Sequence, residues 1–358
     1  MSIDKEGMVS SIKKLDTQNM ISSIEEMPLQ VQEAWGQAQN IKLDYRAKNI
    51  KNILVAGMGG SALGARIIKA LFQKELKVPI DIYNDYSIPA FVNKDTLFIA
   101  SSYSGDTEET LDALEKAIIK TKMIISIGSG GKLIERSKEL NIPFYHIKPS
   151  HNPCNQPRMA VAYSIIGQLA FFDKIGLISL SNDWNNNIIK LLESNNNNYS
   201  LKINPNHNLT QELAAKIYGK IPVIVSSEHL VGAIYTSRNQ FNENSKNYAD
   251  YHIIPELNHH ILESLSFPKS NSKNLVIVII NSKFFDKRNQ KRLKITSEIA
   301  IKNKIEVEYV NLFGETKVEE VFESIHFFAY VIYYLAMLNG CDPSFIPWVD
   351  LFKKKMKK

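Results

Sequence analysis

The sequence predicts an α/β protein built from two doubly wound domains, each a parallel sheet flanked by helices. Short apolar segments alternate with helical stretches through most of the chain, and this order builds parallel sheets. The order runs twice, and the first strands of the halves, at Asn52 and Ile221, start about 170 residues apart, which indicates a coarse internal repeat. The length of 358 residues is sufficient for two domains.

The N-terminal 50 residues read as helices. Apolar residues at mixed three- and four-residue spacing predict helices over Met8 to Leu15 and Pro28 to Gln39. We expect residues 1–50 to form a helical segment packed on the first domain.

Residues 51–155 are expected to form the first domain. Short apolar segments predict five strands, at Asn52–Gly57, Pro79–Tyr83, Thr96–Ser101, Met123–Gly128 and Pro143–Ile147. Helices are predicted over Ser61–Phe72 and Glu108–Lys120.

A connecting segment is expected over residues 156–205. A helix over Arg158–Ile175 leads into residues 181–205, which are crowded with asparagine and other polar residues and are typical of a linker. The second domain then covers residues 206–358. Its predicted elements are strands at Ile221–Ser226, Asn274–Ile280 and Ile305–Val310, and helices from Leu230, over Asp286–Asn303 and over Val321–Leu338.

The composition excludes several classes of protein. A charged fraction of 22% and an aromatic fraction of 9% rule out a largely disordered chain. No apolar run reaches the ~18 residues of a membrane span, and Ile325 to Leu338 reads as a buried core helix. The polar N-terminus lacks the apolar stretch of a signal peptide, so we expect a cytoplasmic protein.

The charge and the cysteines give little indication of a partner. With 43 Lys+Arg against 37 Asp+Glu the net charge is +6, but much of the excess lies in Lys353 to Lys358, which reads as a solvated tail. We therefore expect no nucleic-acid partner. Cys154 and Cys341 give neither a disulfide framework nor a zinc spacing.

The turn after the first strand is rich in glycine. In Gly57-Met-Gly59-Gly60-Ser61 the glycines let the backbone approach an anion, and the following helix offers its N–H groups. A dinucleotide-binding loop is the alternative, since Gly57-x-Gly59-x-x-Ala62 fits the loose fingerprint and Asp85 follows the second strand.

A second loop favours a phosphate monoester over a dinucleotide. After the third strand, Ser102, Ser104 and Thr107 bring hydroxyl donors to the start of a helix. Ser104 or Thr107 is also expected to cap that helix. The two loops together predict a phosphate pocket made by Gly59, Gly60, Ser61, Ser102, Ser104 and Thr107.

These motifs carry a resemblance to a known family. Gly-Met-Gly-Gly-Ser followed by Ser-Tyr-Ser-Gly-x-Thr resembles the sugar isomerase (SIS) domain. Four further motifs resemble those of the bifunctional phosphoglucose/phosphomannose isomerase family: Pro157-Arg158, Asn242-Glu243-Asn244-Ser245-Lys246, Pro255-Glu256-Leu257-Asn258-His259 and Val349-Asp350-Leu351-Phe352-Lys353.

The resemblance implies an aldose–ketose isomerase that uses no metal and no cofactor. Its substrates would be glucose 6-phosphate, mannose 6-phosphate and fructose 6-phosphate, interconverted through an enediolate. Glu243 matches the family's base, Arg158 its guanidinium, His259 its ring-opening histidine and Lys353 its C-terminal lysine. The resemblance also implies a homodimer in which His259 reaches the site of the neighbouring subunit.

The sequence departs from the family pattern at two places. Asp106 stands where members often carry asparagine, and a carboxylate beside a phosphate pocket weakens binding unless it points away. The segment before the C-terminal lysine reads Asp342-Pro343-Ser344-Phe345 in place of Asp-Pro-x-Pro, which leaves the balance between the two epimers open.

Each candidate residue also has a plainer interpretation. A single glutamate, arginine or lysine is usually a solvated or ion-paired surface residue. His259 and His260 invite a metal site, but no cluster of carboxylates and histidines surrounds them in the sequence.

Three other functions remain open at this point. The first is a non-catalytic SIS protein that senses a phosphosugar, the second a dinucleotide-dependent oxidoreductase, and the third a metal-dependent mannose phosphate isomerase.

Overall fold

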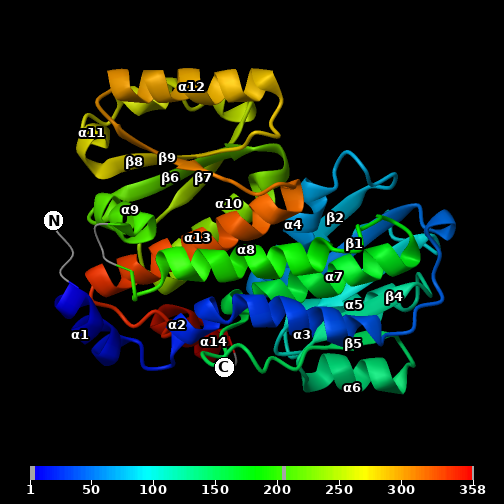
Figure 1. The fold of residues 1–358 in the computed structure, drawn as a ribbon. Helices are drawn as coiled ribbons and strands as arrows, with labels where there is room; N and C mark the ends of the chain where they lie inside the picture. Colours follow the sequence, from blue (N-terminus) through cyan, green and yellow to red (C-terminus); the bar gives the residue numbers. More distant parts are fainter. Residues whose placement is uncertain (1–4, 204–206, 357–358) are drawn as a thin grey trace. The chain divides into compact units, whose positions relative to one another are not determined.

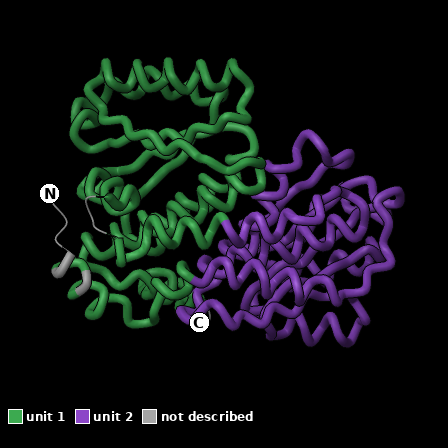
Figure 2. The backbone as a smooth tube through the Cα atoms, in the orientation of Figure 1, with its two compact units in different colours: residues 1–25, 191–358 green, residues 26–190 purple. Residues whose placement is uncertain are grey.

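The computed structural model describes residues 5–203 and 207–356, and the chain forms two compact units (Figure 2). Unit 1 contains residues 1–25 and 191–358, and unit 2 contains residues 26–190. Two parts of the predictions, residues 204–205 of the linker and the last two lysines of the tail, lie outside the described residues.

Unit 2 contains a five-stranded parallel sheet in the order β2-β1-β3-β4-β5. Its strands are β1 (Asn52–Gly57), β2 (Ile80–Tyr83), β3 (Thr96–Ser101), β4 (Ile124–Gly128) and β5 (Phe144–His146). From β1 the chain first adds β2 on one side of the sheet, and it then crosses back to add β3, β4 and β5 on the other side of β1. The switch in strand order therefore lies between β1 and β3. Ligands of doubly wound sheets bind beyond the carboxyl ends of the strands at such a switch.

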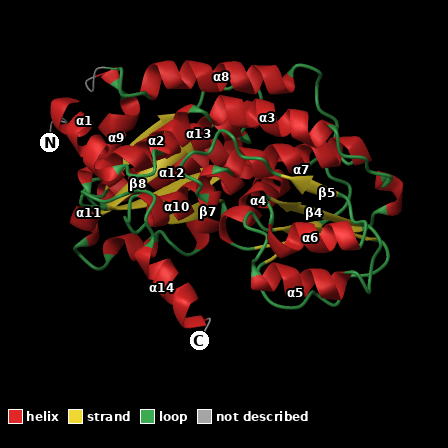
Figure 3. Cartoon of the chain, turned by 90° about the horizontal axis from the view of Figure 1, so that it is seen from below, coloured by secondary structure: helices red, strands yellow, loops and turns green. Residues whose placement is uncertain are grey.

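Helices cover both faces of this sheet (Figure 3). On one face α3 (Met27–Gln39), α4 (Leu63–Leu71) and α7 (Val161–Ile175) pack together; on the other lie α5 (Glu108–Ala117) and α6 (Gly131–Glu139). Leu54 and Phe98 from the strands pack with Leu114 of α5 and Leu133 of α6 in one buried cluster. Because alternate strand residues point to opposite faces, strands that are apolar throughout support helices on both.

Unit 1 contains a four-stranded parallel sheet in the order β7-β6-β8-β9. Its strands are β6 (Ile221–Ser227), β7 (Asp250–Ile254), β8 (Leu275–Asn281) and β9 (Glu306–Asn311). Their order repeats that of β2-β1-β3-β4, so the predicted repeat of a doubly wound domain is confirmed.

The helices of unit 1 complete its core. α12 (Lys287–Lys302) covers one face of the sheet and α10 (Val231–Asn244) the other, while α13 (Lys317–Leu338) packs against α10 and α9 (Leu209–Ile217) (Figure 1). α13 is long and apolar enough to cross a membrane, but 94% of its apolar window is buried, as expected of a core helix. Two further helices are α11 (Asn271–Asn274) and α14 (Pro347–Met356).

The N-terminal helices differ from the prediction. α1 (Lys5–Leu15) and α2 (Met20–Glu25) belong to unit 1, with the second sheet, and only α3 belongs to the first. His326 Nε2 on α13 lies 3.0 Å from the Ile24 carbonyl, and Tyr333 donates to Asp16 Oδ2 at 2.9 Å. An amphipathic pattern predicts a helix with a buried face, but it does not specify which apolar surface covers that face.

The polar segment predicted as a linker forms a helix instead. α8 (Trp184–Tyr199) has 16 residues, although asparagine is a weak helix former. Trp184, Ile188, Leu192 and Tyr199 are all buried, and their spacing places them on one helical face. Burial of this stripe therefore overrides the low helix propensity of the residues between.

Candidate active site

The two loops predicted to bind phosphate follow neighbouring strands of unit 2. The first follows β1 and the second follows β3, and these strands are paired throughout, up to Gly57 opposite Ser101. The structure therefore brings both loops to the switch point of the sheet.

A close backbone approach in the first loop requires Gly60. A Cβ atom at this position would lie 3.1 Å from the Arg158 nitrogen and from the Pro157 carbonyl carbon. The short 3₁₀ helix Pro157–Met159 can therefore lie directly against the loop. The Arg158 side chain is buried, and its Nη1 donates to Gln156 Oε1 at 2.8 Å.

Ser61 joins the two loops to each other. Its Oγ accepts from the Tyr103 N–H at 2.8 Å, and its carbonyl accepts from Ser101 Oγ at 2.8 Å. A cavity of about 10 Å³ lies behind this junction, with room for about one water molecule. The two loops are therefore packed closely against each other at this junction.

The hydroxyls of the second loop divide into two kinds. Ser102 is fully buried; its Oγ lies 2.8 Å from Thr107 Oγ1 and accepts from the Gly105 N–H at 3.1 Å. Ser104 is exposed, and its Oγ accepts from the Asp106 N–H at 3.3 Å. Ser102 thus shapes the loop, whereas Ser104 lies at its surface.

The expected side-chain cap of α5 is absent. Thr107 is the N-cap residue, as predicted, but its side chain makes no capping bond to the helix. The hydroxyl is engaged with Ser102 instead. The N–H groups in the first turn of α5 therefore receive no side-chain oxygen from Thr107, and N–H groups at the start of a helix suit an anion.

Asp106 is directed away from the hydroxyls of its loop. Its Oδ1 accepts from the Lys132 N–H at 3.2 Å, in the first turn of α6. A carboxylate at a helix N-terminus is stabilised by the helix dipole. The departure from asparagine is therefore accommodated by α6.

Asp106→Asn is expected to have a small effect on stability and none on the affinity for phosphate. Loss of the charge at the start of α6 should lower the free energy of unfolding by about 0.3–1 kcal/mol. Urea unfolding would measure this change, and the dissociation constant for inorganic phosphate, measured by calorimetry, should match that of the wild type. A clearly lower dissociation constant in the variant would mean that the carboxylate repels the phosphate.

Glu243 lies in the last turn of α10 in unit 1 and is half-buried. Its neighbours hold the turn: Asn242 Oδ1 accepts from the Ala249 N–H at 2.9 Å, and Asn339 Nδ2 donates to the Ser245 carbonyl at 2.9 Å. The position of Glu243 is thus fixed through the residues on either side of it.

His259 is exposed at the end of a short 3₁₀ helix, Glu256–His259. The preceding residue anchors this helix to α12: Asn258 Nδ2 donates to Thr296 Oγ1 at 2.8 Å and Asn258 Oδ1 accepts from Arg292 Nη1 at 3.1 Å. The His260 ring lies 6.2 Å from that of His252, whose pKa is lowered mainly by burial.

Glu243 and His259 lie at opposite edges of the second sheet. α10 starts beyond the carboxyl end of β6 and returns to the amino end of β7, so its last turn, with Glu243, lies where the strands begin. The 3₁₀ helix with His259 follows the carboxyl end of β7. The structure therefore does not bring these two residues together within unit 1.

Lys353 lies on a helix with no buried residue. α14 exposes Lys353 together with Trp348 and Phe352, which are 80% and 63% exposed. No described contact within unit 1 fixes the position of its side chain. Among the described residues, no group of three His, Cys, Asp or Glu side chains is arranged to hold a metal ion.

The second sheet has a loop of the same backbone shape after its corresponding strand. Gly59 follows β1 with φ of 49°, and Glu228 follows β6 with φ of 47°; each begins a 3₁₀ helix that leads into a longer helix. By this correspondence His229 stands at the position of Gly60. The repeat thus extends from the strand order to the loop geometry.

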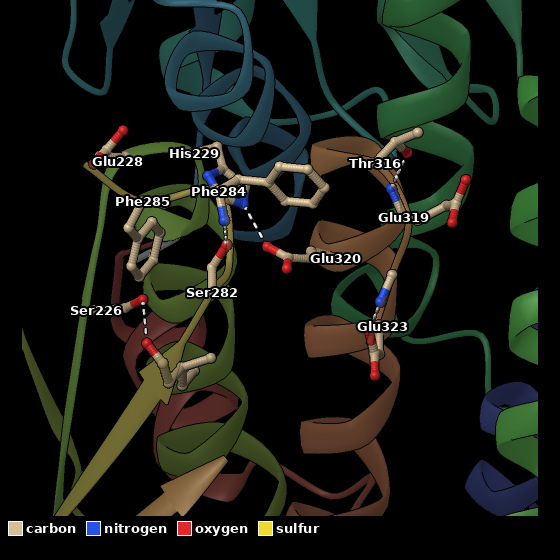
Figure 4. A network of polar contacts seen from close by, with 12 residues as sticks. Ser226, Glu228, His229, Ser282, Phe284, Phe285, Thr316, Glu319, Glu320 and Glu323 are labelled. Atoms are coloured by element: carbon tan, nitrogen blue, oxygen red, sulfur yellow. Dashed lines mark hydrogen bonds and ion pairs between the residues drawn. The ribbon is translucent and has the colours of Figure 1, made fainter. Parts of the chain in front are cut away.

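The side chains of that loop are unsuited to an anion (Figure 4). His229 is buried and pairs with the buried Glu320, with 2.8 Å between Nε2 and Oε2. Ser282 follows β8, but it is buried and its Oγ accepts from the Phe284 N–H at 3.0 Å. The rings of Phe284 and Phe285 both contact His229 edge-on. The sequence indicated no such pair, because its partners are 91 residues apart and neither belongs to a motif.

Family comparisons agree with this division of the chain. Residues 48–173 match the SIS domain family, and residues 206–356 match the family described as the bacterial phospho-glucose isomerase C-terminal SIS domain. A hypothetical protein from Thermus thermophilus has a similar fold, with a TM-score of 0.74 over 99% of this chain and 93% of that one, at 15% identity. The chain is therefore a two-domain SIS protein.

Two relatives of known name show which family of SIS proteins the chain belongs to. A protein of Caldicellulosiruptor bescii named bifunctional phosphoglucose/phosphomannose isomerase is 33% identical over 94% of this chain and 98% of the relative. A Thermoplasma acidophilum protein of the same name is 31% identical over 87% and 92%. The chain belongs to the bifunctional phosphoglucose/phosphomannose isomerase family.

Proposed function

We propose that the chain interconverts glucose 6-phosphate, and also mannose 6-phosphate, with fructose 6-phosphate without a metal or cofactor. Family membership over nearly the whole chain is the observation that carries this proposal. The paired loops of unit 2 support it, since they offer backbone N–H groups and the Ser104 hydroxyl to a phosphate. Gly59, Gly60 and Ser61 contribute from the first loop, while Ser102 and Thr107 hold the second in shape.

Glu243 is the base in this proposal. Its carboxylate takes the proton from C2 of the open-chain aldose; the electrons of that C–H bond form a C1–C2 double bond, and the C1 carbonyl becomes the enediolate oxyanion. The hydroxyl proton of the C2 oxygen then passes to the C1 oxygen, the carboxylate returns its proton to C1, and the C2 carbonyl of the ketose forms. The carbonyl moves from C1 to C2 while no bond of the carbon chain breaks, so a single carboxylate can serve both carbon-bound proton transfers. Loss of the C2 proton removes the stereochemistry that distinguishes glucose from mannose, which explains how one base serves both epimers.

The other residues serve charge and ring opening. Arg158, always charged, stabilises the developing oxyanion of the enediolate. His259 exchanges the proton that opens and closes the sugar ring, and Lys353 contributes a second positive charge. The buried state of Arg158 supports its role, since a charge in a partly dehydrated environment acts more strongly than one in water.

The assembly in this proposal is a homodimer in which His259 serves the site of the other subunit. Two features of unit 1 support it: His259 is exposed, and it lies at the edge of the sheet opposite Glu243. A symmetric dimer provides such exchange twice, because each subunit gives its histidine to the other.

A coupled assay on EDTA-treated protein tests the proposal. Glucose 6-phosphate and mannose 6-phosphate are supplied separately, fructose 6-phosphate is the product measured, and turnover of both is expected without added metal. Activity that appears only when a divalent cation is restored would indicate a metal-dependent isomerase. Phosphosugar binding without turnover would indicate a sensor protein.

A further inference from the structure

The helix that carries Glu243 is tied to one neighbouring helix at both of its ends. Before the start of α10, His229 pairs with Glu320 in the first turn of α13. After its end, Asn339 just beyond α13 donates to the Ser245 carbonyl at 2.9 Å, and Lys246 Nζ donates to the Asp342 carbonyl. α10 and α13 therefore run in the same direction, with polar contacts at each end.

Between these ends the buried residues of α10 include many small or polar ones. They are Gly232, Ala233, Ile234, Thr236, Ser237, Gln240, Phe241 and Asn244. The Thr236 and Ser237 hydroxyls bond to carbonyls of α10 itself, at 2.9 Å and 3.1 Å. Small side chains let two helices approach closely, and Phe241 of α10 packs edge-on against Phe328 of α13, with 6.1 Å between ring centroids. The lengthwise position of α10 on α13 is therefore set by this ring pair together with the polar contacts at its two ends.

We propose that His229 and Glu320 are positioning residues for Glu243, because their buried contact, with 2.8 Å between Nε2 and Oε2, helps to fix α10 lengthwise on α13. This inference rests on the proposed function, in which Glu243 is the base. α10 has 14 residues, a length of about 21 Å, and a hydrogen-bonded helix transmits a lengthwise shift from one end to the other. A displacement of about 1 Å in a catalytic group can reduce the rate about 100-fold.

The environment of the pair suits such a role. The His229 and Glu320 side chains are 2% and 0% exposed, and Figure 4 shows them facing each other between the β6 loop and α13. Removal of either partner leaves the other buried without its counterpart, so the start of α10 loses its polar contact with α13. The contact therefore forms only when α10 lies at one position along the length of α13.

Glu323 provides a matched control on the same helix. It is 3% exposed, one turn beyond Glu320, and burial raises the pKa of its carboxyl. Its Oε2 accepts from the Phe313 and Gly314 N–H groups at 2.9 Å and 2.8 Å, in the segment before α13. Glu323 therefore holds a loop, whereas Glu320 holds the residue that precedes α10.

The test compares full-length variants at a temperature where circular dichroism shows all of them folded. Glu320→Ala and His229→Ala should lower kcat about 10- to 100-fold with KM almost unchanged, equally for both hexose phosphates. His229→Gln and Glu320→Gln, which keep hydrogen-bonding groups, should retain more activity. Glu323→Ala and Glu323→Gln should melt at a lower temperature but keep the wild-type kcat.

Equal kcat values for the Glu320 and Glu323 variants would overturn the inference, as would a loss that lies only in KM. If Glu320→Ala does not fold, the comparison of Glu320→Gln with Glu323→Gln decides the question. Glu243→Gln separates the two proposals. Turnover by that variant contradicts the role of Glu243 itself, whereas an inactive Glu243→Gln beside a fully active Glu320→Ala contradicts only the positioning role.

Discussion

Glu243→Gln is expected to abolish the isomerisation of both glucose 6-phosphate and mannose 6-phosphate. The amide has nearly the size of the carboxylate but accepts no proton, so kcat should fall on the order of 1,000-fold or more. The half-buried side chain at the end of α10 tolerates this change, since Asn242, Ser245 and Asn339 make the contacts that hold the turn.

The measurement is the coupled assay together with phosphosugar binding by calorimetry. Binding should persist in Glu243→Gln, because the loops of unit 2 are unaltered. Glu243→Asp is the conservative companion: it keeps the base but shortens it by one methylene, so it should retain partial activity. Turnover by Glu243→Gln at a near-native rate with either sugar would show that another residue is the base.

A mixture of Glu243→Gln and His259→Ala subunits is expected to regain activity that neither variant has alone. If each site combines Glu243 of one subunit with His259 of the other, a mixed dimer contains one intact site and one doubly altered site. Random reassociation makes half of the dimers mixed, so activity should recover to about one quarter of the wild-type level.

The experiment requires dissociation and reassociation of the two variants, and the unmixed proteins treated in the same way are the control. Persistent inactivity of dimers shown to be mixed would contradict the shared site. Dilution gives an independent check: activity per chain should fall as the dimer dissociates, and a constant value below the dissociation concentration would argue against any exchange of residues.

The fold was largely predictable from the sequence, because its buried strands are continuous apolar runs. β1 and β3 begin and end where the pattern predicted them. β7 was missed because Asp250-Tyr251-His252 mixes polar and aromatic residues, and only Ile254 at its end is buried. An edge strand is covered on fewer sides than a central one and therefore carries a weaker apolar signal.

The site was predictable only where a motif lies on consecutive residues. The glycine and hydroxyl loops follow β1 and β3, so the rule for doubly wound sheets located them at one edge. Glu243 was predicted only from the family resemblance. The rule for doubly wound sheets places ligands at the carboxyl ends of the strands, whereas Glu243 lies near their amino ends. The contact between Pro157–Met159 and Gly60 joins distant segments, and spacing along the chain contains no information about it.

At Glu228 the two halves of the chain reach the same backbone conformation with different residues. A non-glycine residue with φ of 47° costs about 1–2 kcal/mol in backbone energy. Its Oε1, however, accepts from the Asp286 N–H at 2.7 Å and from Asn289 Nδ2 at 3.0 Å. Replacement of Glu228 by glycine, the residue at the matching position of the first half, would remove the backbone cost together with both hydrogen bonds, worth about 0.5–1.5 kcal/mol each. The two contributions are of similar size, so the strained backbone of Glu228 is offset by the contacts of its own side chain, whereas the first half reaches the same backbone shape with a glycine and without such contacts.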